Sequence, residues 1–280
     1  MVERRPILDI VAHVVLVLGI GVIALPVYVM FVASTHTPQA VLAAPMSLWP
    51  GHEAFDNYRA VLTPQAGARS PVAHMMWVSF VSALLIAFGK IVISLLSAFA
   101  IVYLRFRFKG LCFWMIFLTL MLPVEVRIVP TYHVVASLGL LNTYAGLTLP
   151  LIASATATFL FRQFFKTVPR ELTDAARMDG ASPMRFFFTI LLPLSATNIA
   201  AMFVIQFIYG WNQYLWPLLV TTRDDTATIV IGLRRMMGGA DAANEWNLVM
   251  ATAMLALVPP ALVVLVMQRW LVKGLVDSEK

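Results

Sequence analysis

"DAARMDGASPMRFFFTILLP", residues 174–193, is a charged stretch that separates two long apolar runs, 142–162 and 198–219. A helix needs about 20 mostly apolar residues to cross roughly 30 Å of hydrocarbon, and both runs meet that length. The stretch therefore lies in a loop between two membrane spans, and its own pattern predicts ordered structure there.

Local signals in this loop predict a helix, a glycine turn and a second helix. Pro169 suits the first turn of a helix, because its missing N–H group would be unpaired there in any residue. Gly180 is the residue type best able to adopt the left-handed conformation that ends a helix. Ser182 and Pro183 then combine an N-cap with a first-turn proline. Pro193 marks the end of the second helix.

Small and aromatic side chains indicate what this loop contacts. Ala175 and Ala176 carry almost no side chain and so permit close approach by the backbone of another protein. The three phenylalanines at 186–188 are suited to anchor the second helix at the membrane interface. An ordinary amphipathic interfacial loop has the same features, so both interpretations stand at this point.

Composition places the chain in a bilayer. Its 280 residues are 60% apolar and only 12% charged, with a mean hydropathy of +0.84. A soluble domain is about half apolar and a quarter charged. The net charge of +6 is small for a nucleic-acid binder, and its basic residues do not cluster with aromatic ones. The single Cys112 excludes an internal disulfide.

Sequence signatures of catalysis are missing. The chain has no G-x-x-x-x-G-K-[ST] phosphate loop, no H-E-x-x-H and no paired-cysteine motif. Its five histidines are far apart in sequence, which argues against a metal site. No acidic pair stands at helical spacing inside a span, as a proton-coupled pump often shows. A membrane-embedded enzyme is therefore the least favoured class.

Six apolar runs are long enough to span the membrane. They lie near 10–33, 76–103, 112–135, 142–162, 198–219 and 249–270. The first is too long for the apolar core of a cleavable signal peptide, so we expect it to be retained. The third is the least regular, because Pro123, Glu125, Arg127 and Pro130 interrupt it.

The distribution of Lys and Arg orients these spans. With the N-terminus inside, thirteen basic residues fall in cytoplasmic pieces and five in outward pieces. Since cytoplasmic loops carry the excess of Lys and Arg, both termini are predicted to be cytoplasmic. Residues 34–75 and 220–248 then form the two long segments outside the membrane.

Charged side chains inside the spans have two readings. Lys90 falls near the middle of the second span, and Glu125 and Arg127 lie in the third. In the first reading, these side chains pair with each other, extend to the membrane surface or face a partner subunit. In the second reading, Lys90 or Arg127 lines a pathway and attracts an anionic substrate. A phosphate ester would be such a substrate, since the Arg guanidinium matches phosphate geometrically.

The fifth span carries polar and aromatic side chains. Gln206 and Asn212 are candidates to hydrogen-bond a hydroxylated substrate, although bonds to neighbouring helices are the more common use of such residues. Trp211, Tyr214 and Trp216 stand where the aromatic belt of a membrane protein belongs, at the outer end of the span. We interpret them as interfacial anchors.

The opening loop resembles the EAA loop of binding-protein-dependent ABC importer permeases, whose pattern is E-A-A-x3-G-x9-I-x-L-P. The matching positions are Asp174, Ala175, Ala176, Gly180, Ile190, Leu192 and Pro193, with Asp in place of the first Glu. The resemblance extends from about residue 76 to the C-terminus. "YGWNQYLWPLLV" (209–220) is similar to carbohydrate-uptake permeases. "TLMLPVEVRIVPT" (119–131), "SATATFLFRQFF" (154–165) and "GLVDSEK" (274–280) resemble the second permease subunit of sn-glycerol-3-phosphate importers.

This resemblance implies an all-α integral membrane protein with the type I ABC importer permease fold and six transmembrane helices. Residues 1–75 would form the first span and an extracytoplasmic loop, 76–270 the permease core, and 271–280 a cytoplasmic tail. The coupling loop, residues 163–197, would dock on an ATPase. Its implied contact residues are Asp174, Ala175, Ala176, Asp179, Gly180 and Pro193.

The resemblance also implies a function and partners. The chain would be the permease of an inner-membrane importer for sn-glycerol-3-phosphate or related glycerophosphodiesters, with Lys90, Arg127, Gln206 and Asn212 as candidate pathway residues. It would pair with a second permease, two ATPase subunits and an extracytoplasmic solute-binding protein. It would bind no cofactor itself, since ATP and Mg²⁺ are used by the ATPase. The alternatives are an oligosaccharide or polyol permease and a stand-alone secondary transporter.

Overall fold

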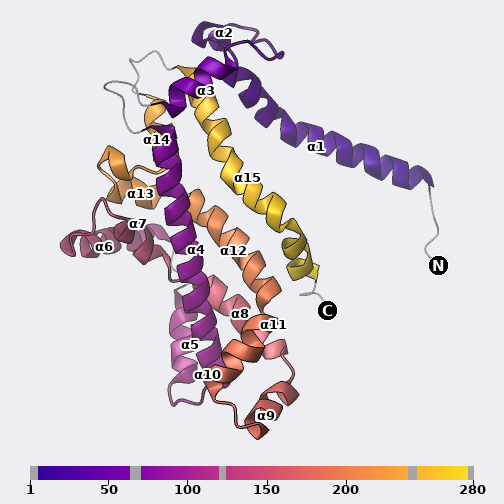
Figure 1. Cartoon of the computed structure of the whole chain (residues 1–280), viewed down its shortest axis with the longest axis vertical. Helices are drawn as coiled ribbons and strands as arrows, with labels where there is room; N and C mark the ends of the chain where they lie inside the picture. The colour runs from indigo at the N-terminus through magenta and orange to yellow at the C-terminus, as the bar shows by residue number, and fades with distance from the viewer. Residues whose placement is uncertain (1–5, 64–70, 120–123, 239–244, 277–280) are drawn as a thin grey trace. The chain divides into compact units, whose positions relative to one another are not determined.

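The computed structural model describes residues 6–63, 71–119, 124–238 and 245–276, and within these ranges the chain is helical and forms no strand (Figure 1). The α-helices are α1 (Pro6–Ser34), α2 (Pro38–Leu42), α3 (Ala54–Leu62), α4 (Val72–Tyr103), α5 (Lys109–Leu118), α6 (Val124–Ser137), α7 (Tyr144–Thr148), α8 (Ala155–Thr167), α9 (Arg170–Met178), α10 (Pro183–Phe186), α11 (Leu192–Leu194), α12 (Ala196–Trp211), α13 (Leu215–Val220), α14 (Ile229–Met236) and α15 (Trp246–Val276). Two short 3-10 helices, η1 (Leu149–Leu151) and η3 (Asp224–Thr226), and a π-helical segment, η2 (Phe187–Leu191), complete them.

Three segments are single helices long and apolar enough to cross a membrane: Ile10–Ser34, Val72–Tyr103 and Trp246–Trp270. Two further candidates are pairs of helices joined at a bend. Tyr144–Leu151 and Ala155–Thr167 meet at 48°, and Pro183–Leu194 and Ala196–Trp211 meet at 73°. The described residues thus contain up to five candidate spans.

The predicted third span is divided in the structure. Its residues fall on α5 and α6, of which α5 is a short apolar helix of 10 residues. Pro123 lies outside the described residues, as does the side chain of Glu125. Pro130 lies inside α6, at the seventh residue of that helix. Six spans with both termini in the cytoplasm stays a prediction.

The chain forms two compact units. The first contains Met1–Ala73 and Gly232–Val258. Its polar centre is Asn57, which is buried and whose side-chain amide donates to the carbonyl oxygens of Ser34 and His36, both at 2.9 Å. The side-chain oxygen of Asn57 accepts from the amide of Asn247 at 2.8 Å. These bonds tie the end of α1, helix α3 and the start of α15 together.

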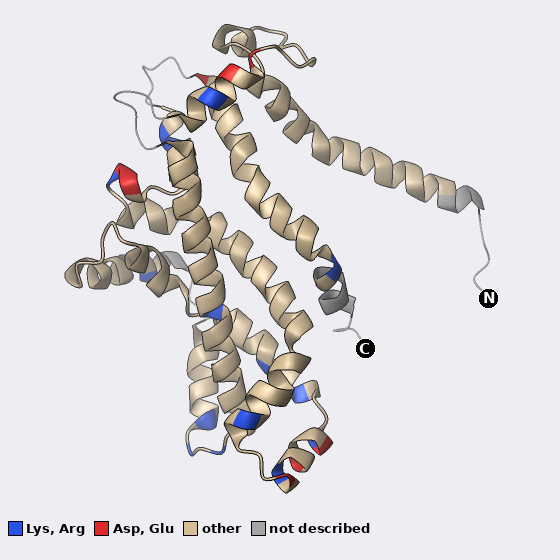
Figure 2. Cartoon of the chain, in the orientation of Figure 1, with Lys and Arg blue, Asp and Glu red and all other residues tan. Residues whose placement is uncertain are grey.

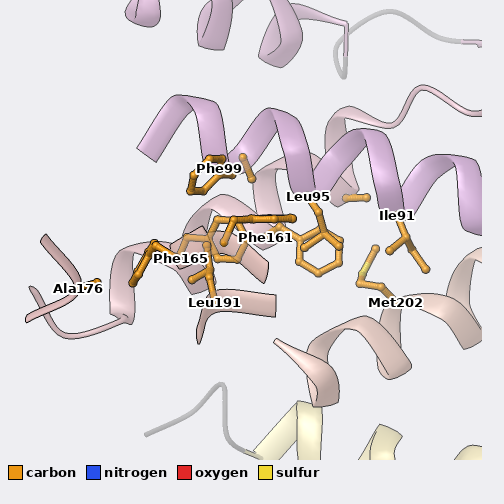
Figure 3. Packing of buried hydrophobic residues seen from close by; sticks show 12 residues of the cluster. Ile91, Leu95, Phe99, Phe161, Phe165, Ala176, Leu191 and Met202 are labelled. Atoms are coloured by element: carbon orange, nitrogen blue, oxygen red, sulfur yellow. The ribbon is translucent and has the colours of Figure 1, made fainter. Parts of the chain in front are cut away.

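The second unit, His74–Ile231 and Pro259–Lys280, is built on α4, which runs beside α12 (Figure 1). Its main core, here called the phenylalanine cluster, joins α4 to the helices of the predicted loop. The buried members are Ile91, Leu95, Ala98, Phe99, Ala157, Phe161, Phe165, Ala176, Phe186, Phe187, Leu191 and Met202. Figure 3 shows Phe99, Leu95 and Ile91 pointing from α4 into this cluster.

The tryptophans predicted as interfacial anchors are instead buried. Trp211 and Trp216 are each only 3% exposed, whereas Tyr214 is 39% exposed. The indole N–H of Trp216 donates to the carbonyl oxygen of Gly146 in α7 at 3.0 Å. The apolar run 198–219 is not one helix, because α12 ends at Trp211 and α13 starts a new helix that packs against α7. This break covers the two indoles with protein.

Close approach of α4 and α12 depends on a glycine. A Cβ atom added at Gly210 would stand 2.9 Å from the Cα atom of Ala83, too near for van der Waals contact with a backbone atom. The two helices therefore touch backbone to backbone, as small residues permit in membrane proteins.

We expect Gly210→Ala to lower the thermal unfolding midpoint of the purified protein, because the added methyl group forces α4 and α12 apart at a cost of about 1–3 kcal/mol. Gly110→Ala is the matched control, since a Cβ there has no neighbour within 4 Å. Equal midpoints for the two variants would contradict this packing.

Candidate functional site

The first part of the predicted loop has the expected helix and turn. Helix α9 begins at Arg170, so Pro169 is its N-cap rather than a residue of its first turn. The helix ends at Met178, Asp179 is its C-cap, and Gly180 follows with φ +70°, in the left-handed region. The backbone N–H of Gly180 donates to the carbonyl oxygen of Arg177 at 3.1 Å, and that of Ala181 to Ala176 at 2.9 Å. This pair of bonds is a Schellman motif, which satisfies carbonyl groups that the helix end would leave free.

The second helix begins where the sequence predicts and ends one residue later than predicted. The backbone N–H of Arg185 donates to the Ser182 hydroxyl oxygen at 3.3 Å, which caps α10, and Pro183 is its first residue. The helix continues through η2 and through α11, which contains Pro193 and ends at Leu194. A bend of 73° then leads into α12.

The two adjacent alanines of the loop face different surroundings. Ala175 is exposed, as are Asp174 and Asp179. Ala176 is only 5% exposed and belongs to the phenylalanine cluster, so its small side chain allows α9 to approach this chain's own core rather than another protein (Figure 3). Asp174 and Ala175 are the exposed residues next to it on α9.

The predicted interfacial anchors are mostly core residues. Phe186 and Phe187 are 4% and 3% exposed, and Phe188 is exposed. The ring of Phe186 lies 5.3 Å from that of Tyr103, at the end of α4. The Tyr103 hydroxyl also donates to the carbonyl oxygen of Phe165 in α8 at 3.1 Å. The prediction was wrong for two of the three rings, because α10 packs against α4 and α8 with its aromatic face inward.

A cavity of about 550 Å³ lies between α4, α5, α6, α8 and α12 of the second unit. Its charged and polar lining residues are Lys90, Ser97, Thr119, Arg127, Thr156, Thr158 and Gln206, together with Ser154 and Tyr209. The structure thus brings Lys90, Arg127 and Gln206 together, three of the four candidate pathway residues. They come from three different helices.

Lys90 is held on an aromatic ring. Its Nζ atom lies 3.4 Å from the centroid of the Tyr209 ring, and its side chain is only 5% exposed. A cation over the face of an aromatic ring is attracted by the electron density of that face. Arg127, in contrast, is exposed on α6 and contributes its side chain to the wall of the cavity.

Asn212 does not belong to the cavity. It is exposed and forms the C-cap of α12, where its backbone N–H donates to the carbonyl oxygen of Ile208 at 3.0 Å. Tyr209 is a lining residue that the sequence interpretation missed, as are Ser97, Thr119 and Thr156. Tyr209 stands three residues after Gln206, on the same face of a helix, and this spacing was the available signal.

Helix α4 connects the loop to the cavity. Lys90, Ile93 and Ser97 line the cavity at helical spacing, while other positions of the same stretch belong to the phenylalanine cluster. Ala176 of α9 lies in that cluster too. A continuous cluster of packed side chains therefore extends from Ala176 of α9 to Ile91 of α4, the residue after Lys90.

Known proteins are similar to this chain over its whole length. Residues 90–277 match the family described as "Binding-protein-dependent transport system inner membrane component". The sn-glycerol-3-phosphate transport system permease protein UgpE of Escherichia coli (strain K12) is 59% identical over 281 residues, with 100% of both chains covered. The proteins of the same name from Brucella melitensis and Agrobacterium fabrum are 58% and 59% identical over 284 residues, again with 100% of both chains covered.

A solved structure shares the fold. It is described as a bacterial ABC transporter involved in the import of the acidic polysaccharide alginate. The matched chain has a TM-score of 0.77 and 20% sequence identity, and the alignment covers 96% of this chain and 99% of that one. At this identity the likeness concerns the fold alone, and the predicted all-α permease fold is confirmed.

We expect Gly180→Val to loosen the loop, because a β-branched residue at φ +70° costs about 1–2 kcal/mol. Trypsin should then cleave after Arg177 about tenfold faster, since cleavage follows the population of the open form. Gly180→Asn is the control, because Asn tolerates the left-handed region. Wild-type cleavage rates in both variants would contradict the predicted role of the glycine.

Proposed function

The chain belongs to the family of binding-protein-dependent transport system inner membrane components, and we propose that it is the permease subunit of an importer for sn-glycerol-3-phosphate. It is an inner-membrane protein. The relatives that carry this substrate in their names align with the chain from end to end at 58–59% identity. The single observation of the structure that favours the same substrate is the pair of cations, Lys90 and Arg127, on one cavity.

The chemistry of the cavity suits a phosphate ester of a polyol. Lys90 and Arg127 supply two positive charges for a dianionic phosphate, and the Arg guanidinium presents N–H donors in a fork that fits phosphate oxygens. Gln206, Ser97 and Thr158 supply donors and acceptors for glycerol hydroxyl groups. A neutral oligosaccharide has no group that requires two cations. The charge of the cavity therefore favours sn-glycerol-3-phosphate over the alternative sugar substrates.

Uptake of such a substrate requires an energy source. Moving a dianion inward against a negative-inside potential costs about 2.3 kcal/mol per charge for each 100 mV, before any concentration gradient. The sequence contains no phosphate loop of its own. We therefore assign ATP hydrolysis, with its Mg²⁺, to two ATPase subunits, and delivery of the substrate to an extracytoplasmic binding protein. A second permease would complete the membrane part.

The coupling loop is the proposed contact with the ATPase. Asp174 and Ala175 are exposed on its helix α9 and Asp179 is exposed at the C-cap, and these residues would meet the partner, while Ala176 holds the helix against the phenylalanine cluster. A displacement of α9 would then move the packed side chains of α4 and, through them, the wall of the cavity that carries Lys90. This gives the proposed importer a continuous physical connection between its ATPase and its substrate.

Co-purification tests the assembly. Tagged chain extracted gently from its native membrane should carry a second permease and the ATPase. We expect Asp174→Ala to weaken ATPase recovery several-fold without loss of folding, because its exposed ion pair with Arg177, at 3.5 Å, contributes only about 0–1 kcal/mol. Asp225→Ala, which also removes an exposed carboxylate beside an arginine, is the control and should retain the ATPase.

Recovery of the chain alone, with uptake in vesicles that lack ATP, would contradict the proposal in favour of a secondary transporter.

Uptake of radiolabelled sn-glycerol-3-phosphate tests the cavity. We expect Lys90→Gln and Arg127→Gln each to reduce uptake efficiency by about tenfold or more, since a hydrogen bond to a charged group contributes about 1.5–3 kcal/mol. Lys90→Arg should retain most activity. Arg223→Gln, an exposed arginine that pairs with Asp225, is the control.

Unchanged uptake and unchanged competition by sugars in both cavity variants would exclude this substrate site.

A further inference from the structure

A second cavity of the same unit, about 560 Å³ in volume, is strongly basic. It lies where the end of α4, the start of α5, the second half of α8 and helix α9 meet, and Figure 2 shows Lys and Arg gathered at this end of the unit. The basic residues on its wall are Arg105, Lys109, Arg162, Lys166, Arg170 and Arg177. Asp174 is the one acidic residue on the same wall.

Within the described part of the chain these charges are poorly neutralised. Arg177 pairs with Asp174 at 3.5 Å, but both side chains are exposed, so the pair is weak. Lys109 donates to the carbonyl oxygen of Val102 at 3.2 Å, which leaves its charge uncompensated. Like charges gathered in a hollow create a strong positive potential that attracts an anion.

Arg162 is prepared to receive that anion. Its guanidinium lies over the Phe113 ring, 4.0 Å from the centroid, which fixes the plane of the group. Among the described residues, the buried Nε atom of Arg162 has no hydrogen-bond partner. A planar guanidinium held in place with unused donor capacity is the arrangement that favours a phosphate group.

The surface next to the cavity is apolar. Lys109, on the cavity wall, is the first residue of α5. Further along α5, Leu111, Trp114, Met115 and Leu118 are each more than half exposed. Their spacing of three, four and seven residues places them on one face of the helix. The basic cavity and the apolar face together fit a molecule with a phosphate head and a hydrocarbon tail.

We propose that this cavity binds the phosphate group of an anionic phospholipid, whose acyl chains lie along the exposed face of α5. The proposal rests on the proposed function for its orientation, because it places the cavity at the cytoplasmic surface, where basic pockets between helices bind such head groups. A free phosphate ion would use the same cations but has no use for the apolar face. The lipid would fill the space behind α9 and brace the coupling loop.

The test uses the assembled importer in phosphatidylcholine nanodiscs titrated with phosphatidylglycerol, with bound lipid counted by native mass spectrometry. We expect Arg162→Gln and Lys166→Gln each to weaken phosphatidylglycerol binding about fivefold, which corresponds to about 1 kcal/mol per charge. Arg107→Gln is the matched control. Arg107 is an exposed arginine between α4 and α5, next to Arg105 and Lys109 in sequence, but it is not on the cavity wall. Arg162→Lys should restore only part of the binding, because it keeps the positive charge but loses the planar fork of N–H donors.

Three outcomes would overturn the proposal. Equal weakening by Arg107→Gln would indicate a diffuse surface charge, and displacement of the lipid by inorganic phosphate would indicate a free-anion site. Binding only when the ATPase is removed would assign the cations to acidic side chains of the ATPase. Uptake of sn-glycerol-3-phosphate by the wild-type importer is measured separately from the lipid count, so failure of this proposal can be distinguished from failure of the proposed function.

Discussion

The burial of Ala176 against the phenylalanine cluster is the contact on which the rest of the arrangement depends. Helix α9 has only nine residues, too few to be stable alone in water. It is held by a Schellman turn at Gly180 and by the one side of the helix that carries Ala176. A larger side chain at that position would separate α9 from Phe165 and Phe186. The loop would then remain attached to the chain but no longer be part of its core.

The packed side chains that begin at Ala176 of α9 reach Ile91 of α4, and the neighbouring Lys90 places a positive charge inside a membrane span. A lysine at the centre of a bilayer costs at least about 2.5 kcal/mol. The Tyr209 ring under the Lys90 ammonium group offsets this by about 2 kcal/mol where water is excluded. The near balance means that Lys90 does not stabilise the fold, so its place on a cavity is better explained by attraction of an anion. Arg127 on the same wall adds to that attraction.

The turn of the loop and the start of its second helix could be predicted, because their signals are local: Gly180 needs a left-handed backbone, and Ser182 caps the helix that Pro183 begins. The chemistry of Lys90, Arg127, Gln206 and Asn212 made each a candidate, but only the packing of α4, α6 and α12 brings the first three to one cavity and leaves Asn212 outside it. The inward faces of Phe186 and Trp216 could not be read from the sequence. An interfacial ring and a core ring have the same local pattern, and only the bends after Leu194 and Trp211 decide which one is covered by protein.

The claim that α9 and α4 move as one body is tested most directly by a distance measurement. In a Cys112→Ser background, spin labels at Met178→Cys on α9 and Leu96→Cys on α4 would both stand at exposed positions, and neither residue is a proposed ATPase contact. The distance between them is measured in the assembled importer without nucleotide and with ATP. We expect one unchanged distance, because the phenylalanine cluster joins the two helices. A distance that changes with ATP, in an importer that still transports, would contradict this claim.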